Sequence, residues 1–222
     1  MKKTLLFSNV VGNISIKNNT ELKFNKYMEE YLFKNVKGHN KLLFINAPGL
    51  GGESNYLKNV IKCFQNLQIN FYDIFNLELD SNKDKLEEFI KDEEKVVYFL
   101  MGGNPLTQME IINKFNLKNR IKEHDGLVIG FCAGAINLSK YSIITTDDDF
   151  KKSLSYQGIG RVDISVEPHF NLEDSEFTKN RLKEIDGFCK TLKTEIYAIP
   201  DKSVIDVLGD SIGFYGEIYK YF

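Results

Sequence analysis

A cysteine between two glycines is the side chain of this sequence best suited to act as a nucleophile. The segment Gly-Phe-Cys-Ala-Gly at residues 130–134 follows the apolar run 126–129 and precedes 135–139, which is compatible with a short helix. A Gly-x-nucleophile-x-Gly segment between a strand and a helix is typical of a nucleophile elbow, whose sharp turn exposes the central side chain. We therefore predict that Cys132 is the nucleophile and that the N–H of Ala133 is an oxyanion donor. The alternative is a buried thiol at a strand end, because free cysteine is often buried.

A cysteine nucleophile needs a base, usually histidine, and often a third group that orients the base. The chain has three histidines. His39 and His124 each precede a predicted strand, so we expect both at the amino ends of the strands. His169 follows the alternating run 162–166 and should lie at the carboxyl ends, on the same side as Cys132. His169 is therefore the predicted base.

Three consecutive aspartates, Asp147, Asp148 and Asp149, are candidates for the acid that orients the histidine. They follow Thr145-Thr146 and a short predicted strand. Like charges are costly to bury together, so at most one of the three can be a sequestered acid. The others then belong to a solvated acidic turn.

A Gly-Gly-Asn loop at residues 102–104 follows the apolar run 95–101. Glycine allows the backbone to approach a substrate carbonyl closely, so this loop is predicted to supply a second oxyanion donor. It is not a dinucleotide fingerprint, because no G-x-G-x-x-G follows any predicted strand. The Gly-Leu-Gly-Gly loop at 49–52 lacks the Gly-Lys-Ser/Thr ending of a phosphate loop.

Apolar runs alternate with amphipathic stretches along most of the chain. Buried strands separated by helices indicate a parallel sheet that is covered on both faces. We therefore expect an α/β fold, a three-layer sandwich with a mostly parallel central sheet, and ligand chemistry at the carboxyl ends of its strands. The predicted strands are 3–8, 41–47, 69–75, 95–101 and 126–129, and the predicted helices are 20–35, 54–67, 80–93 and a helical region that runs to residue 123.

The last part of the chain has a different pattern. Residues 173–193 are typical of a long amphipathic helix, and strands are predicted at 196–200, 203–208 and 212–222, with turns at 201–202 and 209–210. We interpret these strands as an antiparallel C-terminal extension of the same domain. Residues 1–222 are thus expected to form a single domain.

The overall composition excludes several classes of function. The chain has 222 residues, 42% of them apolar, and a net charge of -2 from 29 basic and 31 acidic residues, so we expect neither a nucleic-acid nor an anionic-membrane partner. The N-terminal apolar run is too short for a signal peptide, and no run approaches a membrane span.

Three cysteines without a CxxC pair argue against a disulfide framework or a zinc site, and for a reducing cytoplasm. Cys63 and Cys189 are predicted packing residues, and no metal or organic cofactor is expected.

Four ordered motifs resemble peptidase E, the aspartyl dipeptidases, and its relative cyanophycinase. Members carry a Gly-Gly-Asn loop, a Gly-x-Ser-Ala-Gly-Ala elbow, a Thr-Thr-x-Asp segment and a Pro-His-Phe segment; the matching segments here are 102–104, 130–135, 145–148 and 168–170. The resemblance covers nearly the whole chain. It implies a fold similar to class I glutamine amidotransferases and Ser-His-Asp/Glu hydrolase activity on small aspartyl peptides.

Carried over residue by residue, the resemblance implies that Cys132 takes the nucleophile position and His169 the base. Alignment of the Thr-Thr pair places the acid at Asp148, whereas counting from the nucleophile places it at Asp147. The amides of Gly103 and Ala133 would form the oxyanion hole. The substrate-binding candidates are Gly102, Asn104, Lys179 and Arg181, and the two basic residues could instead face solvent.

Cysteine stands where the family has serine, so the aspartyl specificity of the serine relatives is an open question. Glutamine amidotransferases also use cysteine in this elbow, but they usually carry Gln where this chain has Ile136 and Pro-Glu where it has Phe170-Asn171. A third interpretation is a non-catalytic, thiol-sensing protein, because an exposed, reactive cysteine is also what a redox sensor needs. The expected partners are a small peptide or amide substrate and, in a homodimer, a second copy of the chain.

Overall fold

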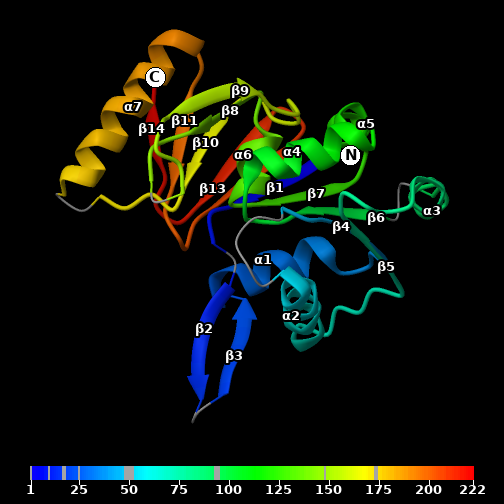
Figure 1. Cartoon of the computed structure of the whole chain (residues 1–222). Coiled ribbons are helices and arrows are strands. Elements are labelled where there is room, and N and C mark those ends of the chain that lie inside the picture. The colour runs from blue at the N-terminus through cyan, green and yellow to red at the C-terminus, as the bar shows by residue number, and fades with distance from the viewer. Residues whose placement is uncertain are drawn as a thin grey trace.

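The structure is a computed structural model that describes residues 2–9, 11–16, 19–24, 26–47, 53–92, 96–147, 149–172 and 175–222. Within these residues, a central sheet has the strand order β13-β12-β1-β7-β6-β4-β5 (Figure 1). In this order, the five strands β1, β7, β6, β4 and β5 are each parallel to their neighbours in that group. Strand β12 runs antiparallel to β1, and β13 runs antiparallel to β12. The bounds are β1 Lys3–Phe7, β4 Lys41–Ile45, β5 Asp73–Leu77, β6 Val96–Leu100, β7 Leu127–Phe131, β12 Val204–Leu208 and β13 Ser211–Tyr215.

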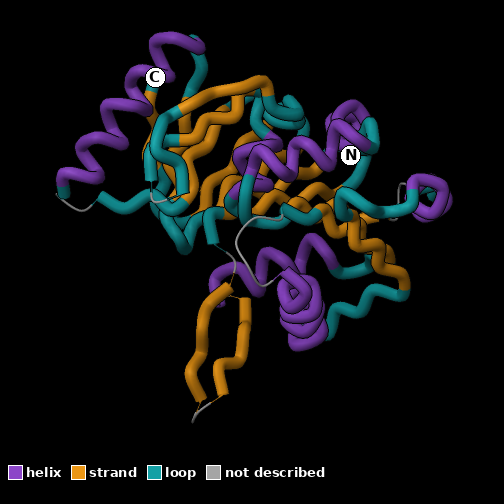
Figure 2. The backbone as a smooth tube through the Cα atoms, viewed as in Figure 1, coloured by secondary structure: helices purple, strands orange, loops and turns teal. Residues whose placement is uncertain are grey.

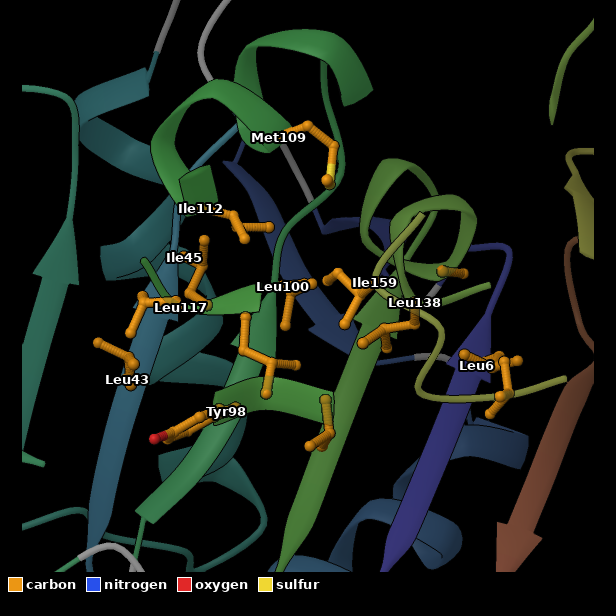
Figure 3. Packing of buried hydrophobic residues seen from close by; sticks show 14 of the residues in the cluster. Leu6, Leu43, Ile45, Tyr98, Leu100, Met109, Ile112, Leu117, Leu138 and Ile159 are labelled. Atoms are coloured by element: carbon orange, nitrogen blue, oxygen red, sulfur yellow. The ribbon is translucent and has the colours of Figure 1, made fainter. Parts of the chain in front are cut away.

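Helices cover both faces of this sheet, which confirms the predicted α/β sandwich (Figure 1). Strand β6 shows why: Tyr98 and Leu100 face one core, and Val97 and Phe99 face the other, since successive strand side chains point to opposite faces. Figure 3 shows the core on the Tyr98 side. That face is covered by α3 (Lys83–Phe89), α4 (Pro105–Lys114), α5 (Lys118–Glu123) and α6 (Ala133–Leu138), and the opposite face by α1 (Lys26–Val36) and α2 (Glu53–Asn66).

A second, smaller sheet lies beside the first and has the order β10-β11-β14. Its strands are β10 (Ser165–Pro168), β11 (Ile196–Ile199) and β14 (Tyr219–Tyr221). Helix α7 (Glu176–Leu192) packs on it through Ile185 and Cys189, with Phe170 in the same core. A two-stranded pair, β8 (Tyr141–Ile144) and β9 (Leu154–Gln157), completes this region.

The strand pairing of the last third of the chain differs from the prediction. Segment 203–208 does form an antiparallel strand of the central sheet, but β11 pairs in parallel with β10 in the smaller sheet. The single strand predicted over 212–222 is in fact β13 and β14, in different sheets, with Gly216 at φ 80 between them. A break of this kind depends on long-range pairing that local alternation does not report.

The helix predicted over 20–35 is wrong in its first part. Strand β3 (Asn19–Phe24) pairs antiparallel with β2 (Val11–Ile16), and this hairpin projects from the sandwich (Figures 1 and 2). The helix begins only at Lys26, where Met28, Leu32 and Val36 repeat every four residues and are all buried. Helix α3 is likewise shorter than its predicted range, and β5 starts later than predicted.

Candidate active site

The chain makes a sharp turn at Cys132, between β7 and α6. Cys132 has φ 49 and ψ -107, a conformation that is rare for a residue other than glycine. Its N–H donates to the carbonyl of Phe7 at 2.9 Å, which continues the pairing of β1 with β7 by one residue. A Cβ atom on Gly134 would lie 2.2 Å from the Leu100 carbonyl oxygen, so the second glycine of the motif lets α6 pack against β6. The result is an elbow that leaves the thiol half-buried.

The Gly102-Gly103 loop lies directly against this elbow. A Cβ atom on Gly102 would be 3.2 Å from Cβ of Cys132. Gly103 has φ 133, and a Cβ atom there would be 2.2 Å from the Ala47 carbonyl oxygen. The next residue, Asn104, is the N-cap of α4: its Oδ1 accepts hydrogen bonds from the N–H groups of Leu106 and Thr107 at 2.9 and 3.2 Å.

Ala133 is the first residue of α6 and is fully buried. At this helix position the N–H group has no carbonyl of a preceding turn to bind. Both predicted oxyanion donors, Gly103 and Ala133, therefore belong to segments adjacent to Cys132.

His169 lies beside Cys132, immediately after β10. The imidazole and the Cys132 side chain interact, and this interaction acts to raise the pKa of His169. Its Nδ1 donates to Oδ1 of Asp201 at 2.7 Å, which leaves Nε2 for the cysteine. The imidazole is 43% exposed, so it is open to a substrate. Like Cys132, His169 has a positive φ, 54.

The carboxylate that binds His169 is that of Asp201, whereas the sequence predicted Asp148 or Asp147 as the orienting acid. Asp147 is exposed, and its Oδ1 accepts the N–H groups of Asp149 and Phe150 at 2.9 and 2.6 Å, so this carboxylate caps its own turn. Asp148 lies outside the described residues. Sequence reasoning misses Asp201, because the pattern around it indicates only a turn between two strands.

The position of Asp201 follows from the pairing of β10 with β11. The two strands are parallel, and Pro168 pairs with Ile199. The residues that follow each strand, His169 on one and Pro200-Asp201 on the other, therefore emerge side by side. Strand β12 then runs back antiparallel to β1, so the Asp201 turn also lies at the carboxyl end of β1.

Ser8, the first residue after β1, links the two side chains. Its buried Oγ donates to Asp201 Oδ1 at 2.8 Å and accepts the backbone N–H of His169 at 2.6 Å. Asn9 Nδ2 donates to the other oxygen, Oδ2, at 3.4 Å. The sequence does not identify either residue as part of the site. The only feature of the sequence that could have indicated them is their position at the end of the predicted strand 3–8.

The hydrogen bonds determine the charge of this cluster. Burial acts to lower the pKa of His169, but hydrogen bonds to Asp201 and Cys132 outweigh it and raise the pKa to about 10. Burial acts to raise the pKa of Asp201, but hydrogen bonds from His169 and Ser8 lower it to about 2. The favoured state at neutral pH is thus an imidazolium held by a carboxylate.

The other two histidines lie away from this cluster, as expected. His124 is buried, stacks on Tyr98 with ring centroids 4.4 Å apart, and its Nε2 lies 3.0 Å from the Val96 carbonyl oxygen. His39 follows α1, and its Nδ1 lies 3.3 Å from the Val36 carbonyl oxygen. Both precede strands of the central sheet and are at its amino end.

A buried network of polar side chains connects the Gly102-Gly103 loop with helix α6, which follows Cys132. Gln108 Nε2 donates to the carbonyl of Met101 at 2.8 Å, and its Oε1 accepts from Asn137 Nδ2 at 3.0 Å. Asn137 also donates to Pro105 and accepts from the Tyr156 hydroxyl at 2.6 Å. Gln108 and Asn137 are fully buried. The network ties the residue before the Gly-Gly loop to the helix that follows the cysteine.

The two basic substrate-binding candidates on α7 differ in environment. Lys179 is exposed. The Arg181 side chain is only 13% exposed, and its nitrogens donate to Glu167, Thr145 and the carbonyls of Pro168 and His169. The Arg181 side chain therefore does not face solvent, because its hydrogen bonds go to groups of the protein; its role in substrate binding stays a prediction.

A cavity of about 610 Å³ adjoins the cluster and is lined in part by His169, Asp201, Asn171, Lys202 and Glu217. Among the described residues, no group of three or more histidine, cysteine or acidic side chains is arranged to hold a metal ion. No helix among them is long and apolar enough to cross a membrane.

Comparisons with known proteins agree with this architecture. A protein from Listeria monocytogenes EGD-e assigned to peptidase E has 18% identity and a TM-score of 0.68, over 97% of this chain and 98% of that one. A peptidase from an acI-B1 Actinobacterium has 16% identity and a TM-score of 0.57, over 99% of this chain and 96% of that one. These similarities show the shared fold. A search of curated proteins found no match.

The family model of peptidase family S51 matches residues 10–214, a range that includes the elbow, the Gly-Gly-Asn loop and His169. Membership in a peptidase family supports a hydrolase that acts on peptide bonds. Because the match covers most of the sequence, the chain belongs to peptidase family S51.

Proposed function

We propose that this protein hydrolyses short peptides by acyl transfer, with Cys132 as nucleophile, His169 as proton carrier and Asp201 as the acid that orients His169. The observation that carries the proposal is that His169 interacts with Cys132 on one side and is hydrogen-bonded to Asp201 on the other, at an elbow flanked by the Gly102-Gly103 loop. A nucleophile, a base and an orienting acid in hydrogen-bond contact are the arrangement that acyl transfer requires.

In the first half of the reaction, the Cys132 thiolate attacks the peptide carbonyl and forms a C–S bond. The amides of Gly103 and Ala133 are the candidate donors to the resulting oxyanion. As the tetrahedral intermediate collapses, the C–N bond breaks, and imidazolium His169 gives its proton to the leaving amine. The products are a thioester on Cys132, a free amine and a neutral imidazole.

In the second half, neutral His169 takes a proton from water, and the resulting hydroxide attacks the thioester carbonyl. The C–S bond breaks, the carboxylic acid leaves, and the thiolate–imidazolium pair is restored. Asp201 stays ionised throughout, because its pKa of about 2 is far below neutral pH. Its role is to hold the ring with Nδ1–H toward the carboxylate and Nε2 toward the reaction.

The size of the adjoining cavity supports a small substrate. Its volume of about 610 Å³ falls within the range typical of small-molecule sites, roughly 300–1,000 Å³. Lys202 and Asn171 line it and are candidate ligands for a peptide carboxylate. Asp-X dipeptides, the substrates implied by the resemblance to peptidase E, are the first to test, although Arg181 donates hydrogen bonds to groups of the protein.

The test is hydrolysis of dipeptides and aminoacyl anilides, with Asp-X peptides and glutamine in the panel. The native protein is compared with Cys132→Ala, Cys132→Ser and His169→Ala, and alkylation of Cys132 is followed by mass spectrometry. We expect peptide cleavage in the native protein and a loss of about 10³-fold or more in both alanine variants. Residual turnover in Cys132→Ser would connect the site with the serine relatives.

Two other outcomes contradict the proposal. Release of ammonia from glutamine, without peptide cleavage, assigns the site to an amidotransferase-like amidohydrolase. Absence of turnover on the whole panel, together with rapid alkylation of Cys132 that does not depend on His169, favours a thiol-sensing protein.

A further inference from the structure

One guanidinium holds the backbone on both sides of the His169 α-carbon. Arg181 Nη2 donates to the Pro168 carbonyl at 2.7 Å, and Nη1 donates to the His169 carbonyl at 3.0 Å. Arg181 lies on α7, which packs against the strand that ends at Pro168 through the small core around Phe170. The side chain thus binds two successive peptide groups at the point where β10 delivers the histidine.

The guanidinium is itself fixed by a buried counter-charge. Glu167 is 2% exposed, and its carboxylate accepts from Nε of Arg181 at 2.5 Å and from the Thr145 hydroxyl at 2.6 Å. The guanidinium carbon also lies 5.9 Å from the ring centroids of both Phe170 and Phe177, a distance at which cation–π attraction is significant. Charge pairing and ring contacts therefore hold the planar guanidinium in one orientation.

The backbone that Arg181 holds is one that would otherwise relax. His169 has φ 54, in the left-handed region that is disfavoured for residues other than glycine. Its N–H is bound by Ser8 and its carbonyl by Arg181, so both peptide groups of this residue are fixed. A rotation of the backbone there would swing the imidazole away from Cys132 and Asp201, since the ring follows the α-carbon.

We propose that Arg181 is a positioning residue for His169: with Glu167 it holds the histidine backbone in the conformation in which the imidazole reaches both Cys132 and Asp201. It acts through His169 and does not bind the substrate side chain. The inference rests on the proposed Cys132–His169 chemistry. It predicts that a change at Arg181 affects all substrates equally, whereas a substrate ligand would affect acidic substrates alone.

The first variant is Arg181→Lys, because an ammonium can still neutralise buried Glu167 but cannot donate to both carbonyls in a fixed plane. Two quantities are measured: the rate of Cys132 alkylation by iodoacetamide at neutral pH, which needs no substrate, and the kcat and KM for peptides with acidic, neutral and basic first residues. Lys183→Gln, an exposed cation on the same helix, is the matched control.

In Arg181→Lys we expect alkylation and kcat to fall about tenfold or more, by the same factor for every peptide, with KM within about twofold of native. The control should match the native protein. A rise in KM confined to acidic peptides, with native alkylation, would overturn the inference and make Arg181 a substrate ligand. Native values of all quantities would overturn it as well.

If Arg181→Lys does not fold, Glu167→Gln serves instead, because the amide keeps an acceptor oxygen of the same shape but loses the charge. Slower alkylation and lower kcat with native KM support the inference, and native alkylation contradicts it. His169→Ala distinguishes a failure of the Cys132–His169 pair from a failure of the positioning role alone. If that variant alkylates at the native rate, the Cys132–His169 pair itself fails; if it is slow while Arg181→Lys and Glu167→Gln are native, only the positioning role fails.

Discussion

Asp201 Oδ1 accepts the Nδ1–H of His169 at 2.7 Å, although the two residues are 32 positions apart and follow different strands. Their proximity results from the parallel, in-register pairing of β10 and β11, which ends at Pro168 and Ile199. Ser8 then bridges the Asp201 carboxylate and the His169 backbone from the end of β1. The candidate active site is therefore built where the two sheets meet.

Replacement of Asp201 tests which acid orients the histidine. In Asp201→Asn the amide can no longer balance an imidazolium, so we expect kcat for the best peptide substrate to fall by roughly 10²–10⁴-fold, with little change in KM. Asp147→Asn should stay within about twofold of native, because an amide oxygen can accept the same N–H groups of its turn. A larger loss in Asp147→Asn or Asp148→Asn than in Asp201→Asn would return the role to the aspartate turn.

The pair should also make stability depend on pH. The pKa of His169 is raised from 6.5 to about 10, so its contribution is complete below pH 6.5 and is lost as pH rises toward 10. The pKa of Asp201 is lowered from 3.8 to about 2, so its contribution is present above pH 3.8 and is lost as pH falls toward 2. Both contributions are therefore largest between pH 3.8 and 6.5.

Urea unfolding of the native protein and of His169→Gln, measured from acid pH to about pH 10, checks the pH dependence. We expect the difference in free energy of unfolding between the two proteins to be greatest in the window from 3.8 to 6.5 and to shrink toward pH 10. A difference that stays constant from acid to alkaline pH would mean that the histidine gains no charged partner on folding.

The Gly-Gly loop should not tolerate a methyl group at its second position. In Gly103→Ala the new Cβ would lie 2.2 Å from the Ala47 carbonyl oxygen at φ 133, so the loop must move away from Cys132. We expect a destabilisation of about 1–3 kcal/mol and a large loss of kcat. Gly187→Ala on α7, where nothing lies within 4 Å of the new Cβ, is the matched control and should be neutral or stabilising by about 0.5–1 kcal/mol. Equal stability and activity of the two variants would contradict the close approach.

The buried network under the elbow should contribute to stability. In Asn137→Leu, the Tyr156 hydroxyl and Gln108 Oε1 lose the partner that they bind in the native protein, which costs roughly 1–3 kcal/mol for each group left unsatisfied. Tyr156→Phe removes the hydrogen bond to Asn137 but leaves the Asn137–Gln108 bond in place, so it should cost less, about 1 kcal/mol. Urea unfolding of both variants measures these differences, and a more stable Asn137→Leu would exclude the network as a stabilising element.

Local patterns account for much of the architecture and for part of the site. The elbow at Cys132 and the loop at Gly102-Gly103 could be predicted because each is a short turn with glycines that directly follows an apolar strand. The contacts that require Gly103 and Gly134 come from other segments, at Ala47 and Leu100, and were not needed for the prediction. The positions of His124 and His169 relative to the strands could also be predicted, because a residue just before or just after a strand of a parallel sheet lies at a known end of it. These inferences need only the order of the elements along the chain.

The remaining features depend on contacts between distant segments. Asp201 and Ser8 reach His169 only because β11 pairs with β10 and β12 pairs with β1. The alternation of apolar and polar residues in a strand does not show which other strand it pairs with. Arg181 has the helical spacing of a surface residue, but its charge is drawn inward by Glu167, a partner that the sequence alone does not identify. The sequence by itself thus determined the nucleophile elbow, the sandwich and the candidate base, since these follow from short glycine motifs, periodicity and the order of the elements. Only the tertiary structure placed Asp201 beside His169 and Arg181 against Glu167, because both contacts depend on which strands and helices pack together.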